Sequence, residues 1–256
     1  MTPRTLTLGD TEVARIGLGT NRLTEAARNV KFIRQAVAAG VGLIDTAHLY
    51  TGGQSETTIG AALSPSPDGH VVATKGGFRP GEGRPEVLRG QIEDSFRRLG
   101  TDAIELYYLH RVDPETPLED SLAVIKEYRD QGKIRHVGLS EVGIEQIERA
   151  RELLPIVAVQ NHYNLSERSH DEVVDYCGAE GLVFVPFFPL GGEGGRALAE
   201  IADAHGATAG RITLAWLLRR SPAMLPIPGS LSLGHVEENL ATLDIELSEA
   251  EFEALR

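Results

Sequence analysis

Residues 103–139 read AIELYYLHRVDPETPLEDSLAVIKEYRDQGKIRHVGL and contain the pattern that decides the fold. An apolar run rich in aromatic residues (103–109) precedes an amphipathic segment with many charged residues (117–131), and a second apolar run follows (134–139). Short apolar runs joined by a helical segment are typical of parallel strands with a crossover helix. This stretch therefore predicts a strand, a helix and a second, parallel strand.

The same alternation recurs along the whole chain. The predicted strands are 15–18, 42–44, 71–74, 103–109, 134–139, 156–160, 182–187 and 224–227. The predicted helices are 29–39, 55–63, 84–99, 117–131, 143–153, 169–180, 197–204 with 208–219, and 234–240. Eight strands that are each followed by a helix predict an α/β fold of the (β/α)8 TIM barrel type.

Both ends of the chain add small elements to this barrel. Gly9 and Asp10 form a turn signal between short apolar runs, which predicts a β-hairpin at the barrel bottom. Near the C-terminus, Ser248 and Glu251 have the spacing of a capping box and predict a short helix at 247–255. Because no linker interrupts the pattern, we expect residues 1–256 to form a single domain.

Composition excludes several classes of protein. The chain has 25 Lys and Arg against 37 Asp and Glu, a net charge of −12, which argues against nucleic acid or an anionic membrane as partner. We find neither a signal peptide nor a run long enough for a membrane span. The single cysteine, Cys177, cannot form an internal disulfide, so we expect a cytoplasmic protein. No segment indicates an obligate interface, and we expect a monomer.

Four chemically active residues follow three consecutive predicted strands. Asp45 and Tyr50 follow the second strand, Lys75 the third and His110 the fourth, at the barrel end where active sites form. Taken alone, each has an ordinary structural explanation, such as a helix cap or a core aromatic. Together, they form an acid–base set. We expect Asp45 to keep Lys75 charged, and the ammonium to lower the pKa of Tyr50 toward neutrality. His110 is placed to hydrogen-bond a substrate oxygen.

Four segments resemble the aldo-keto reductases, in order along the chain. They are IDTAHLY (44–50), ATKG (73–76), YLH (108–110) and GLS (138–140). The resemblance implies reduction of a small-molecule carbonyl substrate by hydride from a nicotinamide cofactor. It also implies that Asp45, Tyr50, Lys75 and His110 are the catalytic tetrad, with Tyr50 as general acid.

The resemblance also implies the cofactor site, with NADP(H) preferred and NAD(H) possible. Ser140 and Gln160 match positions that bind the nicotinamide carboxamide, and Phe187 matches an aromatic residue stacked on the ring. The other implied cofactor residues are Thr20, Asp45, Phe188, Leu190, Gly191, Gly229, Ser230, Ser232, His235, Glu238 and Asn239. Gly192, Gly194 and Ala197 fit a short dinucleotide-binding pattern, but no acidic residue follows about 20 positions on, so we interpret this segment as a flexible glycine loop.

This chain departs from the family at several cofactor positions. Phe187 stands where Tyr is usual, and Glu141 stands where Asn often follows the serine. Many NADPH-dependent members carry Lys in place of Gly229 and Arg in place of His235 to hold the 2′-phosphate. Because both cations are missing, we expect a weaker preference for NADPH than is usual.

The loops around the predicted pocket are short. Residues 76–85 form a ten-residue loop, the glycine loop leads almost at once into a helix, and the chain ends at Arg256. We therefore expect an open site that accepts bulky or varied carbonyls. Its substrate-binding residues, by family position, are Asn21, Leu49, Phe78, His110 and Arg111. Arg111 has two interpretations: it binds a substrate carboxylate or phosphate, or it forms a salt bridge with Asp113.

Other functions were weighed on the same residues. A regulatory or slowly turning over cofactor-binding barrel is the main alternative. A Schiff-base aldolase or isomerase built on Lys75 is disfavoured, because Asp45 would keep the amine protonated. A metal site is not predicted, since the eight histidines show no paired spacing. We interpret His162 as filling the mouth of the barrel beside Asn161.

Overall fold

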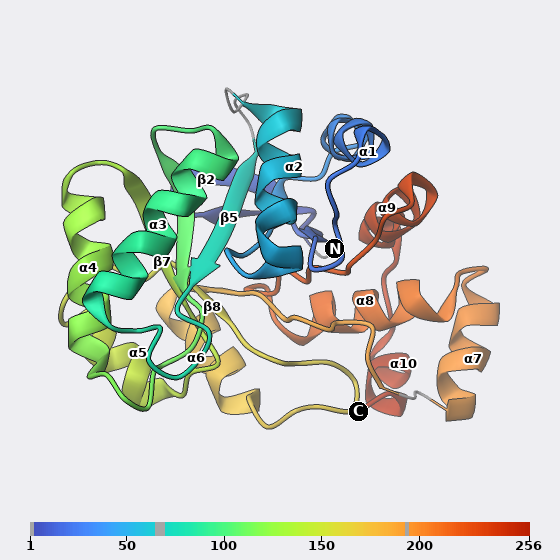
Figure 1. Cartoon of the computed structure of the whole chain (residues 1–256). Coiled ribbons are helices and arrows are strands. Elements are labelled where there is room, and N and C mark those ends of the chain that lie inside the picture. The colour runs from blue at the N-terminus through green and yellow to red at the C-terminus, as the bar shows by residue number, and fades with distance from the viewer. Residues whose placement is uncertain (1–2, 65–69, 193–194) are drawn as a thin grey trace.

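A parallel sheet of seven strands forms the centre of the fold (Figure 1). The structure is a computed structural model, and it describes residues 3–64, 70–192 and 195–256. The strands lie in chain order: β3 (Leu18–Gly19), β4 (Leu43–Asp45), β5 (Val71–Gly76), β6 (Ile104–Leu109), β7 (Ile134–Ser140), β8 (Ala158–Gln160) and β9 (Val183–Phe184). Every neighbouring pair is parallel, as the strand and helix alternation predicts.

Helices connect the strands and lie around the curled sheet (Figure 1). They are α1 (Ala27–Ala38), α2 (Gln54–Leu63), α3 (Pro85–Leu99), α4 (Leu118–Asp130), α5 (Ile144–Arg151), α6 (Asp171–Glu180), α7 (Gly195–Ala204), α8 (Ala209–Arg220) and α9 (Leu233–Leu240). Two 3-10 helices accompany them, η1 (Tyr50–Gly53) and η2 (Ala241–Asp244). The predicted helices are present, with ends that differ by one or two residues. Among the described residues, no helix is long and apolar enough to cross a bilayer.

The predicted eighth strand, 224–227, does not join the sheet as a strand. The segment runs between the two edge strands and makes only isolated bridges. Leu225 N–H donates to the carbonyl of the last β9 residue at 2.9 Å, and Gly17 N–H donates to the carbonyl of Pro226 at 2.9 Å. Pro226 and Pro228 have no N–H and cannot donate to β3 in return, so a regular ladder cannot form. The structure thus shows a curled seven-stranded sheet where eight strands were predicted.

The first predicted strand is also shorter than expected. Only Leu18 and Gly19 pair with β4, whereas the predicted strand began at Arg15. The backbone N–H of Arg15 donates instead to the carbonyl of Arg4, at the start of the hairpin. Residues 15–17 therefore connect the hairpin to the sheet.

The hairpin and the terminal helix match their predictions. Strands β1 (Thr5–Leu8) and β2 (Thr11–Ala14) are antiparallel, and Gly9 at the turn has a φ of 64°. Leu8 and Val13 pack against residues at the starts of β4, β5 and β6, so the hairpin covers the N-terminal end of the sheet. Helix α10 (Glu249–Ala254) begins with the capping box of Ser248 and Glu251.

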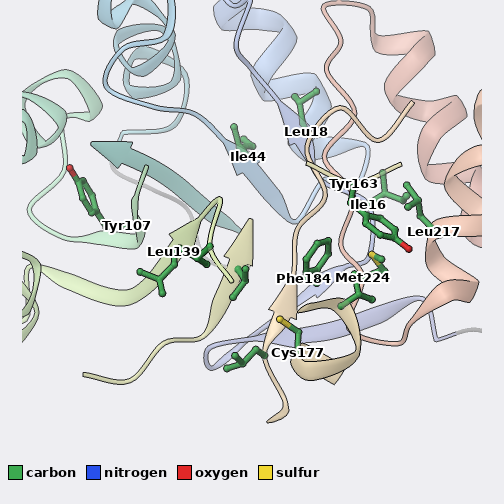
Figure 2. Close-up of a cluster of buried hydrophobic side chains, with 14 of the residues drawn as sticks. Ile16, Leu18, Ile44, Tyr107, Leu139, Tyr163, Cys177, Phe184, Leu217 and Met224 are labelled. Carbon is green, nitrogen blue, oxygen red and sulfur yellow. The ribbon is translucent and has the colours of Figure 1, made fainter. Parts of the chain in front are cut away.

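The sheet is buried on both faces, which explains its nearly continuous apolar strands. On β6, Tyr107 belongs to the larger core cluster and Tyr108 to the smaller one, and both side chains are fully buried. Figure 2 shows part of the larger cluster, with Tyr107, Phe184 and Met224 among its members. A core on each side fixes the strands and therefore the positions of the side chains that follow their C-terminal ends.

Candidate active site

A pocket of about 760 Å³ opens at the C-terminal ends of the strands. Its size lies within the range of small-molecule sites. The predicted site residues that line it are Thr20, Asn21, Asp45, Leu49, Tyr50, Phe78, His110, Arg111, Ser140, Gln160, Phe187, Phe188, Leu190, Gly191 and Gly229. The fold therefore brings most of the predicted set to one cavity.

Lys75 and Asp45 form a buried ion pair beside this pocket. Lys75 Nζ donates to Asp45 Oδ1 at 2.6 Å and to the carbonyl of Thr46 at 2.8 Å. Both side chains are almost completely inaccessible to solvent. Burial lowers the pKa of Lys75. The Asp45 carboxylate and Tyr50 together raise this pKa by more than burial lowers it, so the net shift is upward. Lys75 is therefore a protonated ammonium at neutral pH, which disfavours the Schiff-base alternative.

Tyr50 extends this pair toward the cavity. Its hydroxyl lies 3.4 Å from Lys75 Nζ, and the ammonium lies 4.9 Å from the centre of the ring. Thr51 and Gly52, the next two residues, both have positive φ values, of 50° and 67°, and so turn the chain sharply after Tyr50. This left-handed turn leads into α2.

The expected fall in the pKa of Tyr50 is wrong. Burial raises the pKa of the hydroxyl; the Lys75 ammonium lowers it, and the Asp45 carboxylate raises it again. The net shift is upward, because the effect of burial outweighs that of the ammonium, which the Asp45 carboxylate also opposes. Tyr50 is consequently a fully protonated phenol at neutral pH.

His110 is a neutral imidazole in this environment. Burial lowers its pKa to about 2, with further lowering by the charges of Lys75 and Arg111. Its ring lies edge-on to Tyr50, with 6.1 Å between ring centres, and 4.8 Å from the ring of Phe78. Nδ1 is buried without a hydrogen-bond partner in the described part of the chain. Because an unpaired N–H is costly to bury, we assign the single proton to Nε2.

A chain of buried hydroxyl groups holds the backbone below the ion pair. Thr20 Oγ1 donates to the carbonyl of Asp45 at 2.8 Å. Ser55 Oγ lies 2.8 Å from Thr20 Oγ1 and 2.7 Å from Thr46 Oγ1. Sequence reasoning missed Ser55, because its place in α2 shows no pattern that indicates contact with two strand ends.

The residues expected to bind nicotinamide lie together on one wall. Gln160 Nε2 donates to Asp45 Oδ2 at 2.8 Å, and Ser140 Oγ accepts from Arg111 Nη1 at 3.0 Å. Phe187 stacks on His162, with 5.2 Å between ring centres and 10° between planes. His162 therefore packs against a ring of the pocket wall. No cluster of three or more ligand side chains suited to a metal occurs among the described residues.

Of the residues expected to bind the adenosine end, Gly229 lines the pocket and the others lie outside it. Ser230 and Ser232 are on the loop after Gly229, with Ser230 Oγ accepting from the N–H of Ser232 at 3.0 Å. His235, Glu238 and Asn239 are on helix α9, which begins directly after this loop. These residues follow Gly229, which lines the pocket, along the chain. Gly194 of the glycine pattern lies outside the described residues.

The predicted salt bridge between Arg111 and Asp113 is absent, and the alternative interpretation of Arg111 stays open. Asp113 instead accepts from the N–H groups of Gly81 and Gly83 at 3.0 and 2.9 Å and so fastens the 76–85 loop. The Arg111 side chain lies against Phe78 instead, with 5.2 Å between its guanidinium carbon and the centre of the Phe78 ring.

Two further features, one beside the pocket and one in its wall, were not predicted. Glu141 has a φ of 56°, a left-handed conformation, and its carboxylate accepts from the N–H of His162 at 2.6 Å. Arg22, an exposed cation, lines the pocket next to Asn21. A single arginine three residues after a strand carries no recognisable signal, so only the structure places Arg22 there.

The chain belongs to the aldo/keto reductase family, whose sequence model matches residues 15–196 and 193–256. It is therefore an NAD(P)H-dependent oxidoreductase. It is 36% identical to pyridoxine 4-dehydrogenase of Escherichia coli, over 97% of this chain and 96% of that protein.

Solved structures agree with this assignment. The thermostable aldo-keto reductase Tm1743 superposes with a TM-score of 0.90 and 34% identity, covering 98% of both chains. An aldo/keto reductase of Klebsiella pneumoniae, solved with NADP and acetate, gives a TM-score of 0.88 and 29% identity, covering 98% of this chain and 94% of that one.

Proposed function

We propose that the protein reduces aldehydes and ketones to alcohols, with NADPH as hydride donor and Tyr50 as general acid. The observation that carries this proposal is the linked set of Asp45, Lys75 and Tyr50 beside a neutral His110 in one pocket. The Tyr50 hydroxyl is the acidic end of this set. Its neighbours leave it protonated at the pH of the cytoplasm.

The residues present fit a nicotinamide cofactor. Phe187 offers an aromatic face on the pocket wall, and Gln160 and Ser140 offer side-chain oxygens for a carboxamide. The backbone is also close-packed at one edge, because a Cβ on Gly19 would meet the carbonyl of Ile227 at 2.8 Å. We assign Gly229, Ser230, Ser232, His235, Glu238 and Asn239 to the adenosine end, as the family resemblance implies.

When bound, the reduced nicotinamide supplies a hydride to the carbonyl carbon. His110 holds the carbonyl oxygen by a hydrogen bond from Nε2–H, and Tyr50 transfers its phenolic proton to that oxygen as negative charge develops. The Lys75 ammonium then stabilises the phenolate that is left, and Asp45 keeps the ammonium in place. Tyr50 recovers a proton from solvent.

We propose that NADPH is preferred over NADH by a small margin. Relatives were solved with NADP, but Gly229 and the exposed His235 give this chain no lysine or arginine at the two positions that the resemblance links to the 2′-phosphate. Competing kcat/KM measurements with the two cofactors test this, and an equal or higher value with NADH contradicts it.

We further propose broad acceptance of bulky carbonyls. The pocket is wide and its wall residues Phe78, Phe188 and Leu190 are exposed. Pyridoxal belongs in the substrate panel because the E. coli relative is named for pyridoxine. A submicromolar KM for one small aldehyde, with rejection of larger ones, contradicts this part of the proposal.

The remaining proposals concern architecture. We infer that residues 1–256 form one (β/α)8 barrel domain, which the 224–229 segment closes through its bonds to both edges of the sheet. We also propose a monomer that works in the cytoplasm, because one chain supplies the whole tetrad and the single cysteine is buried and free. Light scattering of the purified protein tests the monomer.

The decisive experiment is Tyr50→Phe, assayed by NADPH consumption with a panel of activated aldehydes. We expect kcat to fall about 10³-fold, while NADPH affinity measured by fluorescence stays nearly unchanged. Tyr107→Phe is the matched control, since that buried hydroxyl lies outside the pocket and has no hydrogen-bond partner in the described residues. Retention of most activity by Tyr50→Phe would show that the assigned mechanism is wrong.

A further inference from the structure

Arg111 is held at the wall of the pocket next to His110. Its backbone N–H donates to the carbonyl of Gly77 at 3.0 Å, which fixes the start of the side chain. The guanidinium lies between two rings, 5.2 Å from the centre of Phe78 and 5.8 Å from that of Phe187. Stacking on aromatic faces is a preferred setting for arginine and limits its conformations.

The charge of Arg111 has no carboxylate partner. No acidic oxygen lies within 4.0 Å of its guanidinium in the described part of the chain. Within the described part of the chain, the hydrogen bonds of its side chain use only Nη1, which donates to the carbonyl of His110 at 2.7 Å and to Ser140 Oγ at 3.0 Å. Glu141 is the nearby acid, but its carboxylate is bonded to the N–H of His162. Nε and Nη2 of this half-buried cation therefore keep donors for an incoming acceptor.

The surroundings of this cation are apolar. Phe78 and Phe188 are 39% and 60% exposed although they line the pocket, and Leu49 and Leu190 line it as well. A flat hydrophobic body that carries one negative charge matches a wall of this kind, because the rings cover its faces and the guanidinium meets its charge.

The reacting groups and the cation share one neighbour. The Phe78 ring lies 4.8 Å from the His110 ring, between centres, and 5.2 Å from the Arg111 guanidinium carbon. The group that would hold the carbonyl oxygen and the free cation therefore line the same pocket beside one aromatic ring. A substrate that carries both a carbonyl and a carboxylate on an aromatic body can meet both groups.

We propose that Arg111 selects aromatic aldehydes and ketones that carry a carboxylate, by binding that carboxylate while the carbonyl lies at Tyr50 and His110. This proposal rests on the proposed reductase function and names its substrate class. Two N–H donors of the guanidinium can face the two carboxylate oxygens, the arrangement in which arginine binds carboxylates best.

The test compares two substrates that differ only in charge, 4-carboxybenzaldehyde and its methyl ester. We expect kcat/KM for the acid to exceed that for the ester by about 10-fold. Arg111→Met should lower this ratio about 10-fold, and Arg111→Lys should retain part of it. Arg79→Met is the matched control: that exposed arginine pairs with Glu82 of the same loop, 76–85, and is not in the pocket wall, so its ratio should equal that of the unaltered protein.

The outcomes separate the two proposals. An unchanged ratio in Arg111→Met, or an equal loss for acid and ester, overturns the role of Arg111. If the unaltered protein reduces neither substrate nor any other carbonyl, the reductase function fails instead. Calorimetric binding of 4-methylbenzoate to protein saturated with NADP⁺ then still tests Arg111, because it requires no turnover. There we expect at least about 10-fold weaker binding to Arg111→Met than to Arg79→Met, and equal binding overturns the inference.

Discussion

Gln160 donates a hydrogen bond from its side-chain amide to Asp45, with 2.8 Å between Nε2 and Oδ2. Lys75 binds the other oxygen of the same carboxylate at 2.6 Å. Both Asp45 oxygens are therefore fixed, and the carboxylate is almost completely inaccessible to solvent. The bond also sets the orientation of the Gln160 amide, because its nitrogen faces Asp45 and its carbonyl oxygen is left for another donor.

Substitution of Gln160 should affect both chemistry and cofactor binding. Gln160→Leu removes the donor to Asp45 and the acceptor proposed for the nicotinamide carboxamide, at nearly constant volume. We expect NADPH affinity to fall about 10-fold and kcat to fall as well, since Asp45 loses one of its two fixed partners. Fluorescence titration and steady-state kinetics measure the two effects. If both NADPH affinity and kcat are unchanged, Gln160 has no role in cofactor binding or in chemistry.

The sequence predicted the parts of the fold that local pattern controls. Strands β5, β6 and β7 have long apolar runs, and their predicted ends differ from the observed ones by two residues at most. The capping box of α10 was predicted at the correct residues. The eighth strand failed for a local reason as well. Its apolar pattern predicts a strand, but Pro226 and Pro228 remove two donors from the ladder.

The candidate site was predicted as a set of residues but not in its energetics. Consecutive strand ends and the family resemblance together predicted Asp45, Tyr50, Lys75 and His110 as one set, and the structure brings these four side chains together. Two predictions were wrong because the predicted properties depend on three-dimensional surroundings. The pKa of Tyr50 is controlled by burial. Asp113 binds backbone N–H groups of the 76–85 loop instead of Arg111. Ser55 and Arg22 were missed for the same reason, because only packing brings them to the site.

The pH dependence of reduction follows from the shifted groups. The pKa of Tyr50 lies above its ordinary value of about 10, and that of His110 is about 2. Reduction needs protonated Tyr50 and neutral His110, and both conditions hold from about pH 5 to about pH 9. We expect a flat profile of kcat/KM over this range at constant ionic strength. Oxidation of the alcohol needs the phenolate, so its rate should rise with pH. An acid limb with a midpoint near the ordinary histidine pKa would show that His110 titrates.

Arg15 is expected to be essential for stability. Its side chain is fully buried, and its guanidinium donates to the carbonyls of Leu218, Ser221 and Met224 at 3.0, 2.6 and 3.2 Å. Arg15→Met removes the shared donor of these three carbonyls and one buried charge. We expect the free energy of unfolding in urea to fall by about 3 kcal/mol. Arg196→Met removes an exposed arginine and should cause no measurable change. If Arg15→Met and Arg196→Met unfold at the same urea concentration, Arg15 is not essential for stability.

Cofactor preference should respond to one added charge at Gly229. A Cβ there would meet its nearest atoms, the Gly19 carbonyl oxygen and Asn21 Oδ1, at 3.6 and 3.7 Å, so a side chain fits without strain. Gly229→Lys places a cation where the family resemblance puts the 2′-phosphate. We expect the ratio of kcat/KM for NADPH over NADH to rise about 10-fold, and the gain to shrink as salt increases. Gly229→Met, of similar length but uncharged, controls for the change in shape. If Lys and Met give the same ratio, the phosphate does not lie at this loop.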